Sequence, residues 1–160
     1  MKARSDRPAI EVVKRLGNIP PIECYAAQLN QVFMNIIANA IDALEEHNVP
    51  EPCIEIELLT QDNNLLVAIT NNGPAIPEEV REKLFDPFFT TKQPGKGTGL
   101  GLSISYQIVT DRHGGQLQCE SRDGKTTFQI QVPIHRSSRG SQASVSSSSP
   151  ETFPEPVAVG

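Results

Sequence analysis

The sequence has no apolar run that approaches the roughly 18–20 residues needed to cross a membrane. Its first residues also lack the apolar stretch of a secretory signal peptide. Basic residues are in the minority, because 14 Lys and Arg stand against 19 Asp and Glu, for a formal net charge of −5. An acidic chain of this kind does not favour a broad nucleic-acid-binding surface. We therefore expect a soluble, cytoplasmic chain without direct contact to membrane or nucleic acid.

Cysteine is also scarce, with three residues far apart in the sequence: Cys24, Cys53 and Cys119. The odd number argues against a disulfide framework, and the wide spacing argues against a zinc site. Free cysteines are typical of a reducing compartment, which agrees with a cytoplasmic location.

The composition changes near residue 136. Residues 136–160 contain eight serines and three prolines but few large apolar side chains. Such a segment cannot bury enough apolar surface to offset the entropy lost on ordering. We expect one domain over residues 8–135, which is long enough for a hydrophobic core, followed by a disordered tail over 136–160.

Hydrophobic periodicity predicts alternating blocks of helices and strands. The predicted helices cover residues 28–46, 77–84 and 100–113. The predicted strands cover residues 9–15, 53–59, 65–71, 115–121 and 126–134. The last two strands form a hairpin around Asp123-Gly124, and Pro77 suits the first turn of the short helix. This order predicts an α/β fold, a two-layer sandwich of helices against a mixed, mostly antiparallel sheet.

Four alternating glycines, Gly95, Gly97, Gly99 and Gly101, occur in the stretch PFFTTKQPGKGTGLGLSIS, residues 87–105. Without side chains, their backbone N–H groups can approach a ligand closely. A helix that follows them adds unpaired N–H groups and its positive dipole end, a combination typical of phosphate binding. The Walker A and dinucleotide-binding spacings are both absent. A hinge without a ligand is the alternative.

Three polar residues of the long helix, Asn35, Asn39 and Asp42, are spaced i, i+4 and i+7. They share one narrow face. We expect this face roughly opposite the apolar stripe of the same helix, which is formed by Leu29, Val32, Phe33, Ile36, Ile37, Ala40, Ile41 and Leu44. Asparagine is a weaker helix former than Glu, Lys or Gln, so it is an unusual choice for a merely solvated face. The carbonyl oxygens of two stacked asparagines suit a hard cation such as Mg²⁺. A solvated polar face is the alternative.

Two further segments flank the short helix. The polar turn TNNGPAIPEE, residues 70–79, reads as a plain loop when taken alone. Phe85, Phe88 and Phe89 stand directly before the glycine-rich stretch. We expect these phenylalanines to be core anchors at the base of a mobile lid over about residues 90–99.

Together these segments resemble the ATP-binding catalytic domain of bacterial histidine kinases, within the GHKL family. The N box is matched by QVFMNIIANAIDAL, the first glycine box by NNGPAIP, the F box by LFDPFFTTK and the second glycine box by GKGTGLGLSIS. The F box together with the GTGLGL box is specific to histidine kinases. The resemblance runs from about residue 10 to 133 and implies the Bergerat fold, with ATP and Mg²⁺ held between the long helix, the sheet and the lid.

The resemblance also implies roles for individual residues. Asn39 corresponds to the Mg²⁺ ligand and Asn35 lines the same phosphate side, so these two are the implied catalytic residues. The other implied ATP-binding residues are Asp42, Asn71, Gly73, Ala75, Ile76, Lys92, Gly97, Thr98, Gly99, Leu100, Gly101 and Thr126.

Three positions depart from the family pattern. Asn71 replaces the aspartate that accepts a hydrogen bond from the adenine amino group, and it keeps a carbonyl acceptor while adding an NH₂ donor. Ala75 replaces the second glycine of the first glycine box, and Lys125 replaces a glycine of the closing hairpin. Many relatives also carry a lysine at the position of Asp42.

The implied function is transfer of the γ-phosphoryl group of Mg²⁺-ATP to a histidine on a dimerisation domain, in two-component signalling with the receiver domain of a response regulator. His47, His113 and His135 do not lie in a sequence that resembles an H box. The acceptor is therefore expected on a dimerisation domain outside this sequence, and residues 1–7 are expected to be a remnant of the linker to it. A regulatory pseudokinase module and a serine kinase of the anti-sigma type are the alternatives.

Overall fold

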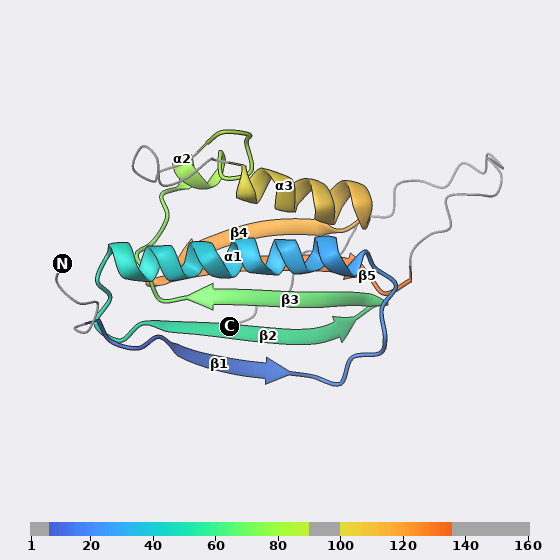
Figure 1. The fold of residues 1–160 in the computed structure, drawn as a ribbon, viewed down its shortest axis with the longest axis horizontal. Helices are drawn as coiled ribbons and strands as arrows, with labels where there is room; N and C mark the ends of the chain where they lie inside the picture. Colours follow the sequence, from blue (N-terminus) through green and yellow to red (C-terminus); the bar gives the residue numbers. More distant parts are fainter. Residues whose placement is uncertain (1–6, 90–99, 136–160) are drawn as a thin grey trace.

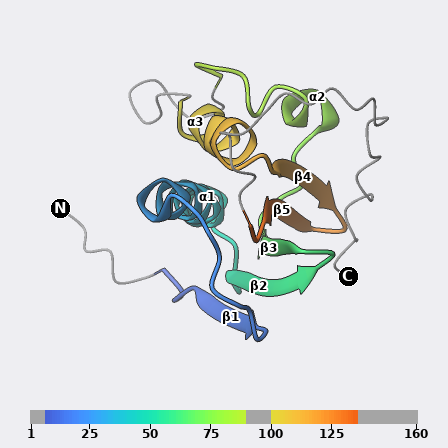
Figure 2. The ribbon, with the colours of Figure 1, turned by 90° about the vertical axis from the view of Figure 1, so that its right-hand side faces the viewer.

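A computed structural model describes residues 7–89 and 100–135. One five-stranded sheet with the order β1-β2-β3-β5-β4 forms the first layer (Figure 1). Helices α1 and α3 lie side by side on one face of this sheet and form the second layer (Figure 2). The predicted two-layer α/β sandwich is confirmed.

The elements agree closely with the sequence prediction. The strands are β1 (Glu11–Leu16), β2 (Cys53–Gln61), β3 (Asn64–Asn71), β4 (Gln116–Arg122) and β5 (Lys125–Pro133). The helices are α1 (Ala26–Glu46), α2 (Glu78–Arg81), α3 (Gly101–Gln107) and the π-helical turn η1 (Ile108–Arg112). All five predicted strands are present, each with bounds within about two residues of the prediction.

The helix predicted over residues 77–84 is shorter than expected. Pro77 precedes the first helical residue of α2, with an extended ψ of 147°. Beyond Arg81, the N–H groups of Lys83 and Leu84 bond to carbonyls three residues back, which makes tight turns instead of a helix. The helix predicted over 100–113 is present, but its second half widens into the π-helical η1.

The sheet is mixed, as predicted. Strand β1 pairs with β2 in parallel, and the other three pairings are antiparallel. Two-residue turns close both hairpins, Asp62-Asn63 between β2 and β3, and Asp123-Gly124 between β4 and β5. All four turn residues have positive φ, between 51° and 72°. Turns of this kind match the right-handed twist of the strands, and they set the register of the sheet.

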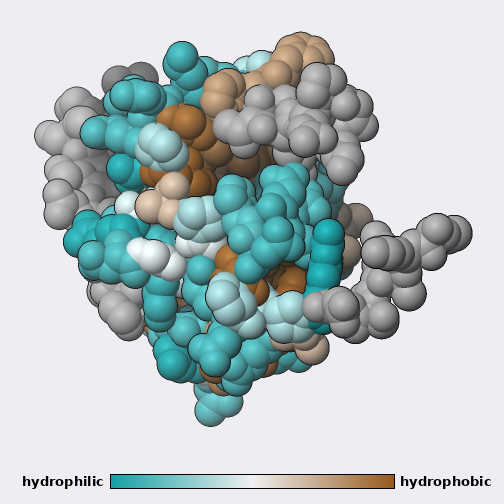
Figure 3. All heavy atoms as spheres, turned by 90° about the vertical axis from the view of Figure 1, so that its left-hand side faces the viewer, coloured by the Kyte–Doolittle hydropathy of each residue, from teal (hydrophilic) through white to brown (hydrophobic). Residues whose placement is uncertain are grey.

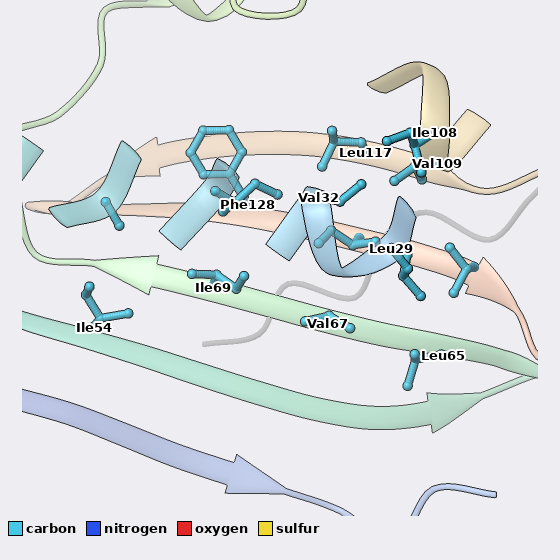
Figure 4. Close-up of a cluster of buried hydrophobic side chains, with 14 of the residues drawn as sticks. Leu29, Val32, Ile54, Leu65, Val67, Ile69, Ile108, Val109, Leu117 and Phe128 are labelled. Atoms are coloured by element: carbon cyan, nitrogen blue, oxygen red, sulfur yellow. The ribbon is translucent and has the colours of Figure 1, made fainter. Parts of the chain in front are cut away.

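The core lies between α1, the middle of the sheet and η1 (Figure 4). The most completely buried aliphatic side chains are Val32, Ile36, Ile69, Val109, Ile130 and Val132. Each such side chain stabilises the fold by about 1.5–3 kcal/mol relative to an exposed one. The apolar stripe predicted on the long helix is therefore the surface that joins the two layers.

The direction of the strands and helices brings the segments that were predicted to bind ATP to one end of the molecule. Strand β3 ends at Asn71, and its antiparallel partner β5 begins beside it. The second half of α1, the start of α3 and helix α2 lie at the same end, on the left of Figure 1. Figure 3 looks onto this end and shows hydrophobic side chains between larger hydrophilic areas.

Candidate functional site

Polar side chains replace apolar ones where the sheet reaches this end. Asn71 lies between Ile54 of β2 and Thr126 of β5 in the register of the sheet, and Thr126 pairs with Ser121 of β4. Asn71 is 4% exposed and Thr126 is 2% exposed. Because a buried polar group is costly unless it is hydrogen-bonded, hydrogen bonds determine the structure of this end.

The segment of residues 72–77, the β3–α2 loop, is held by these side chains. The Ile76 N–H group donates to Ser121 Oγ at 2.8 Å, and Ser121 Oγ lies 3.0 Å from Thr126 Oγ1. The Gly73 N–H group donates to Asn71 Oδ1 at 3.0 Å. Two backbone donors of the loop therefore bond to side chains of the sheet.

Gly73 is a position where only glycine fits without adjustment. A Cβ atom there would lie 2.9 Å from Asn71 Oδ1 and 3.7 Å from the Ala43 side chain. The first of these distances is shorter than real Cβ contacts allow. The absence of a side chain lets the loop pack between β3 and α1 while its N–H group reaches Asn71.

On the helix side, Asn35 joins α1 to α3. Its Nδ2 group donates to the Gly101 carbonyl at 3.1 Å and to Ser105 Oγ at 3.2 Å. Ser105 Oγ itself donates to the Gly101 carbonyl at 2.8 Å. Asn35 is therefore a partner of the first turn of α3, in addition to its predicted place beside the phosphates.

The predicted orientation of the polar face of α1 was wrong. Asn35, Asn39 and Asp42 are all half-buried, whereas the solvent face of the helix carries Met34 and Ala38. Helix α3 packs beside α1 (Figure 2), and Asn35 bonds to its first turn. Asn39 and Asp42 follow Asn35 on the same face of α1, at i+4 and i+7.

The phenylalanine prediction is confirmed for Phe85 and wrong for Phe88. Phe85 packs against the core and stacks on Tyr106, with ring centroids 5.3 Å apart and an interplanar angle of 27°. Phe88 is 74% exposed and has a φ of 65°, so its backbone turns the side chain away from the core. Phe89 is half-buried. The predicted lid, residues 90–99, lies outside the described residues.

The structure brings together part of the predicted ATP-binding set. Asn71, Gly73, Ile76 and Thr126 meet around the β3–α2 loop. Across from them, Asn35 and Gly101 join the two helices, with Leu100 directly before α3. Ala75 is exposed within the loop. Lys92, Gly97, Thr98 and Gly99 lie outside the described residues.

Sequence reasoning missed Ser121, Ser105 and Asn72. Ser121 follows Leu117 and Cys119 on one face of β4, and a hydroxyl on an otherwise apolar face was an available signal. Ser105 stands one helical turn after Gly101, but only the packing of α1 against α3 shows its role. Asn72 accepts from the Cys53 N–H group and donates to the Glu51 carbonyl, both at 2.7 Å, which ties β3 to β2.

The side chains that hold the β3–α2 loop are neutral amides and hydroxyls. Among residues 7–89 and 100–135, no group of three His, Cys, Asp or Glu side chains is placed to hold a metal ion. The same part of the chain contains no helix long and apolar enough to span a membrane. Neutral donors and acceptors of this kind suit recognition of a polar ligand by hydrogen bonds.

Comparison with known proteins identifies the relatives of this chain. Residues 24–136 match the family model described as histidine kinase-, DNA gyrase B-, and HSP90-like ATPase. Sporulation kinase E of Bacillus subtilis is 38% identical over 122 residues, which is 76% of this chain and 16% of that protein. The sensor histidine kinase ZraS of Escherichia coli is 34% identical over 118 residues, 73% of this chain and 24% of that protein.

Solved structures show the same fold. The catalytic domain of histidine kinase ThkA has a TM-score of 0.69 and 36% identity, and the match covers 79% of this chain and 80% of that domain. ThkA in complex with the response regulator protein TrrA has a TM-score of 0.64 and 34% identity, and the match covers 78% of this chain and 34% of that one. The match thus covers four fifths of the ThkA catalytic domain, whereas this chain spans less than a quarter of sporulation kinase E and of ZraS.

Proposed function

Because this chain belongs to the family of histidine kinase-, DNA gyrase B- and HSP90-like ATPases, we propose that it binds Mg²⁺-ATP and donates the γ-phosphoryl group to a histidine of another domain. The observation that carries this proposal is the polar row of Asn71, Thr126 and Ser121 under the β3–α2 loop, in which Asn71 and Thr126 are buried and Ser121 is half-buried. It ends the apolar core at the same end of the molecule as the polar flank of α1. The purine is proposed to lie over the row and the phosphates to extend towards Asn39.

The donor set of this end fits Mg²⁺. Asn39 carries an amide oxygen on the half-buried flank of α1, and hard cations bind such oxygens. Mg²⁺ usually keeps several waters and is held largely by substrate phosphates, so a site of few protein ligands is sufficient. Bound there, Mg²⁺ would neutralise charge on the phosphate oxygens.

The remaining work of the chain is positioning. Asn35 holds α1 against the start of α3 through two hydrogen bonds. Asn39, the proposed metal ligand, lies one turn later on the same helix, whose apolar stripe packs in the core. Phosphoryl transfer depends mainly on such alignment and on stabilisation of charge. The acting residues need not form covalent bonds with the substrate.

His113, the most buried histidine among the residues that the structure describes, is unsuited to accept the phosphoryl group. His113 is 6% exposed, its Nε2 atom accepts from the Tyr25 N–H group at 3.1 Å, and its Nδ1 atom lies 2.8 Å from the Ile108 carbonyl. Both ring nitrogens are thus occupied. This supports the proposal that the acceptor is a histidine of a dimerisation domain. A response regulator is proposed as the next acceptor, since ThkA, which this chain resembles, forms a complex with one.

Asn39→Ala tests the nucleotide site. We expect the variant to lose Mg²⁺-ATP binding in isothermal titration calorimetry while its thermal unfolding stays close to that of the wild type, because a half-buried polar side chain is removed and not a core one. Asn30→Ala, an exposed asparagine on the same helix, is the matched control and should bind normally. Equal Mg²⁺-ATP affinity in Asn39→Ala and the wild type would contradict the assignment.

Incubation with γ-labelled ATP tests the acceptor. The 160-residue chain alone should acquire no acid-labile phosphate, and a histidine-containing dimerisation domain supplied in trans should become labelled. Acid-labile label on the chain itself would show that one of its own histidines is an acceptor.

A further inference from the structure

Strand β1 lies at the edge of the sheet, with β2 as its one neighbour among the strands that the structure describes (Figure 1). The Glu11 N–H group donates to the Pro52 carbonyl at 2.9 Å. Just past the other end of the strand, the Gly17 N–H group donates to the Leu58 carbonyl, also at 2.9 Å. Because backbone groups alternate in direction along a strand, the odd-numbered residues of β1 bond to β2, and the even-numbered residues direct their N–H and C=O groups away from the sheet.

This outer edge of β1 is open and partly apolar. Val12 is 50% exposed and Leu16 is 61% exposed. Figures 1 and 2 show β1 at the margin of the sheet, on the side away from α3. A row of unpaired backbone groups beside exposed apolar side chains is a template for pairing with a strand of another molecule. The edge is therefore an interaction surface, and its sequence indicates which strand fits it.

A second copy of β1 can pair with this edge in the antiparallel direction. Groups that point outwards must then meet groups that point outwards, so even-numbered residues lie opposite even-numbered residues of the second copy. A register centred on Val13 meets this requirement and places Lys14 opposite Val12 of the second copy. It also places Leu16 opposite Ile10, so two apolar side chains meet at each end of the paired strands.

The two neighbouring symmetric registers that keep this alternation are less favourable. A register centred on Lys14 places this lysine opposite the same lysine of the second copy, and like charges directly opposite each other destabilise strand pairing. A register centred on Val12 places Leu16 opposite Pro8, which has no N–H group to donate. The sequence of the edge thus selects the register centred on Val13.

The selected register also pairs opposite charges. It places Glu11 opposite Arg15 of the second copy and, by the two-fold symmetry, makes the same pair a second time. Arg15 has a partner within its own chain, Glu55 at 3.8 Å, but 60% of its side chain remains exposed beside that ion pair. Opposite charges that face each other across two strands stabilise their pairing.

We propose that this chain forms a two-fold symmetric dimer in which β1 pairs in the antiparallel direction with β1 of a second copy, in the register centred on Val13. The two sheets become one continuous sheet, with the helices of both copies on the same face. A contact of one strand pair is small, so the dimer is weak and forms at high concentration. It requires no nucleotide and is therefore independent of the proposed phosphoryl transfer.

Sedimentation equilibrium of the full 160-residue chain, without nucleotide, measures this dimer. Over total concentrations from about 10 µM to about 1 mM, the average mass of the wild type should rise from that of the monomer towards twice that value. A wild type that stays monomeric throughout this range would overturn the proposal.

Charge reversal tests the register. Glu11→Arg puts two basic side chains opposite each other and Arg15→Glu puts two acidic ones, so each variant alone should dimerise at least about tenfold more weakly than the wild type. An equimolar mixture of the two variants should associate about as tightly as the wild type, because each acidic strand then faces a basic one. Glu82→Arg makes the same change of charge at an exposed position after α2, and its Kd should equal that of the wild type.

A proline tests the backbone bonds. Lys14→Pro removes an N–H group that points away from β2, so the sheet within each chain keeps its bonds while the dimer loses a bond from each copy. Lys14→Ala keeps this N–H group and is the matched control. Dimerisation should be lost in Lys14→Pro and retained in Lys14→Ala, with similar thermal unfolding of the two variants.

The remaining outcomes decide against the proposal. A mixture of Glu11→Arg and Arg15→Glu that associates no more tightly than either variant alone would place the contact at another surface, such as the β4 edge. Unchanged dimerisation in Lys14→Pro would do the same. Should Lys14→Pro fail to fold, the two charge variants and their mixture decide the question, because both positions are exposed.

Discussion

The middle of the sheet and its end under the β3–α2 loop are built from opposite chemistry on the same strands and the same face. Ile69 pairs with Phe128 in the middle, and two residues further along Asn71 pairs with Thr126. All four side chains are buried. The apolar pair is stabilised by contact with any well-fitting neighbour, whereas the polar pair depends on which atom donates and which accepts. The stability of the middle of the sheet therefore depends on the volume of its side chains, and the stability of the end depends on the match of hydrogen-bond donors and acceptors.

The largest effect is expected from a loss of volume in the middle. Ile36→Ala removes a fully buried side chain of α1 and leaves a cavity against the sheet. The free energy of unfolding should fall by about 2–5 kcal/mol, measured by urea denaturation. Met34→Ala on the same helix removes a side chain that is 65% exposed and should change stability by less than about 0.5 kcal/mol. Similar losses in both variants would show that α1 does not form the core as described.

The next effect is expected from removal of one hydroxyl at the polar end. Ser121→Ala leaves the Ile76 N–H group and the Thr126 hydroxyl without their shared partner, and Thr126 is buried. An unsatisfied buried group costs about 1–3 kcal/mol, so the free energy of unfolding should fall by that amount although almost no volume is lost.

A second threonine pair supplies the control for Ser121→Ala. Thr70 and Thr127 share a 2.8 Å hydrogen bond on the opposite, half-buried face of the sheet. Water can replace a partner there, so Thr127→Val should cost well under 1 kcal/mol. If Thr127→Val proved as destabilising as Ser121→Ala, burial would not explain the difference between the two pairs.

The same division explains what could be predicted from the sequence. The stripe of α1 and the alternation of the strands are local signals, because each depends on residues a few positions apart. They predicted the layers, the sheet and the core face of α1. The partners of Asn35 and Asn71 follow from loop geometry and from the packing of α1 against α3, and no spacing rule contains that information.

Two predicted features failed, each for a reason that the local pattern does not contain. A phenylalanine is expected in the core on composition alone, but the backbone of Phe88 at a φ of 65° takes it to the surface. The polar face of α1 was expected opposite its stripe because the periodicity of one helix cannot show where a second helix packs. Helix α3 covers that flank and makes Asn35 half-buried.

A smaller effect is expected in the turn that aligns the polar pair. Gly124 has a φ of 72° and nothing within 4 Å of the position of a Cβ atom. Gly124→Ala therefore tests backbone conformation alone and should cost about 1–2 kcal/mol, the penalty of the left-handed region for a residue with a side chain. Gly124→Asn should cost less, because asparagine tolerates this region. Equal losses for alanine and asparagine would point to a steric cause in place of a conformational one.

The smallest effect is expected at Cys119, which marks the border between the two regions. It lies on β4 beside Phe128, two residues before Ser121 on the same face, and it packs against the core. Burial raises the pKa of its thiol from the ordinary value of 9.0 to about 12. The thiol therefore stays protonated in the folded protein at pH 8, and the folded state loses stability as the pH rises above 9.0.

The rate of alkylation measures how well the Cys119 thiol is shielded from solvent, since the thiolate is the reactive form. At pH 8, iodoacetamide should modify Cys119 in the folded chain at least ten times more slowly than in the chain unfolded by urea, as followed by mass spectrometry of the peptides. Because the pKa is raised by desolvation and not by a hydrogen bond, Ser121→Ala should leave this rate almost unchanged in the folded protein. A large acceleration in Ser121→Ala would mean that the polar row protects the apolar middle from water. In that case the middle and the end of the sheet would open to solvent as one cooperative unit. The two regions would then differ in the interactions that stabilise them, but they would not open independently.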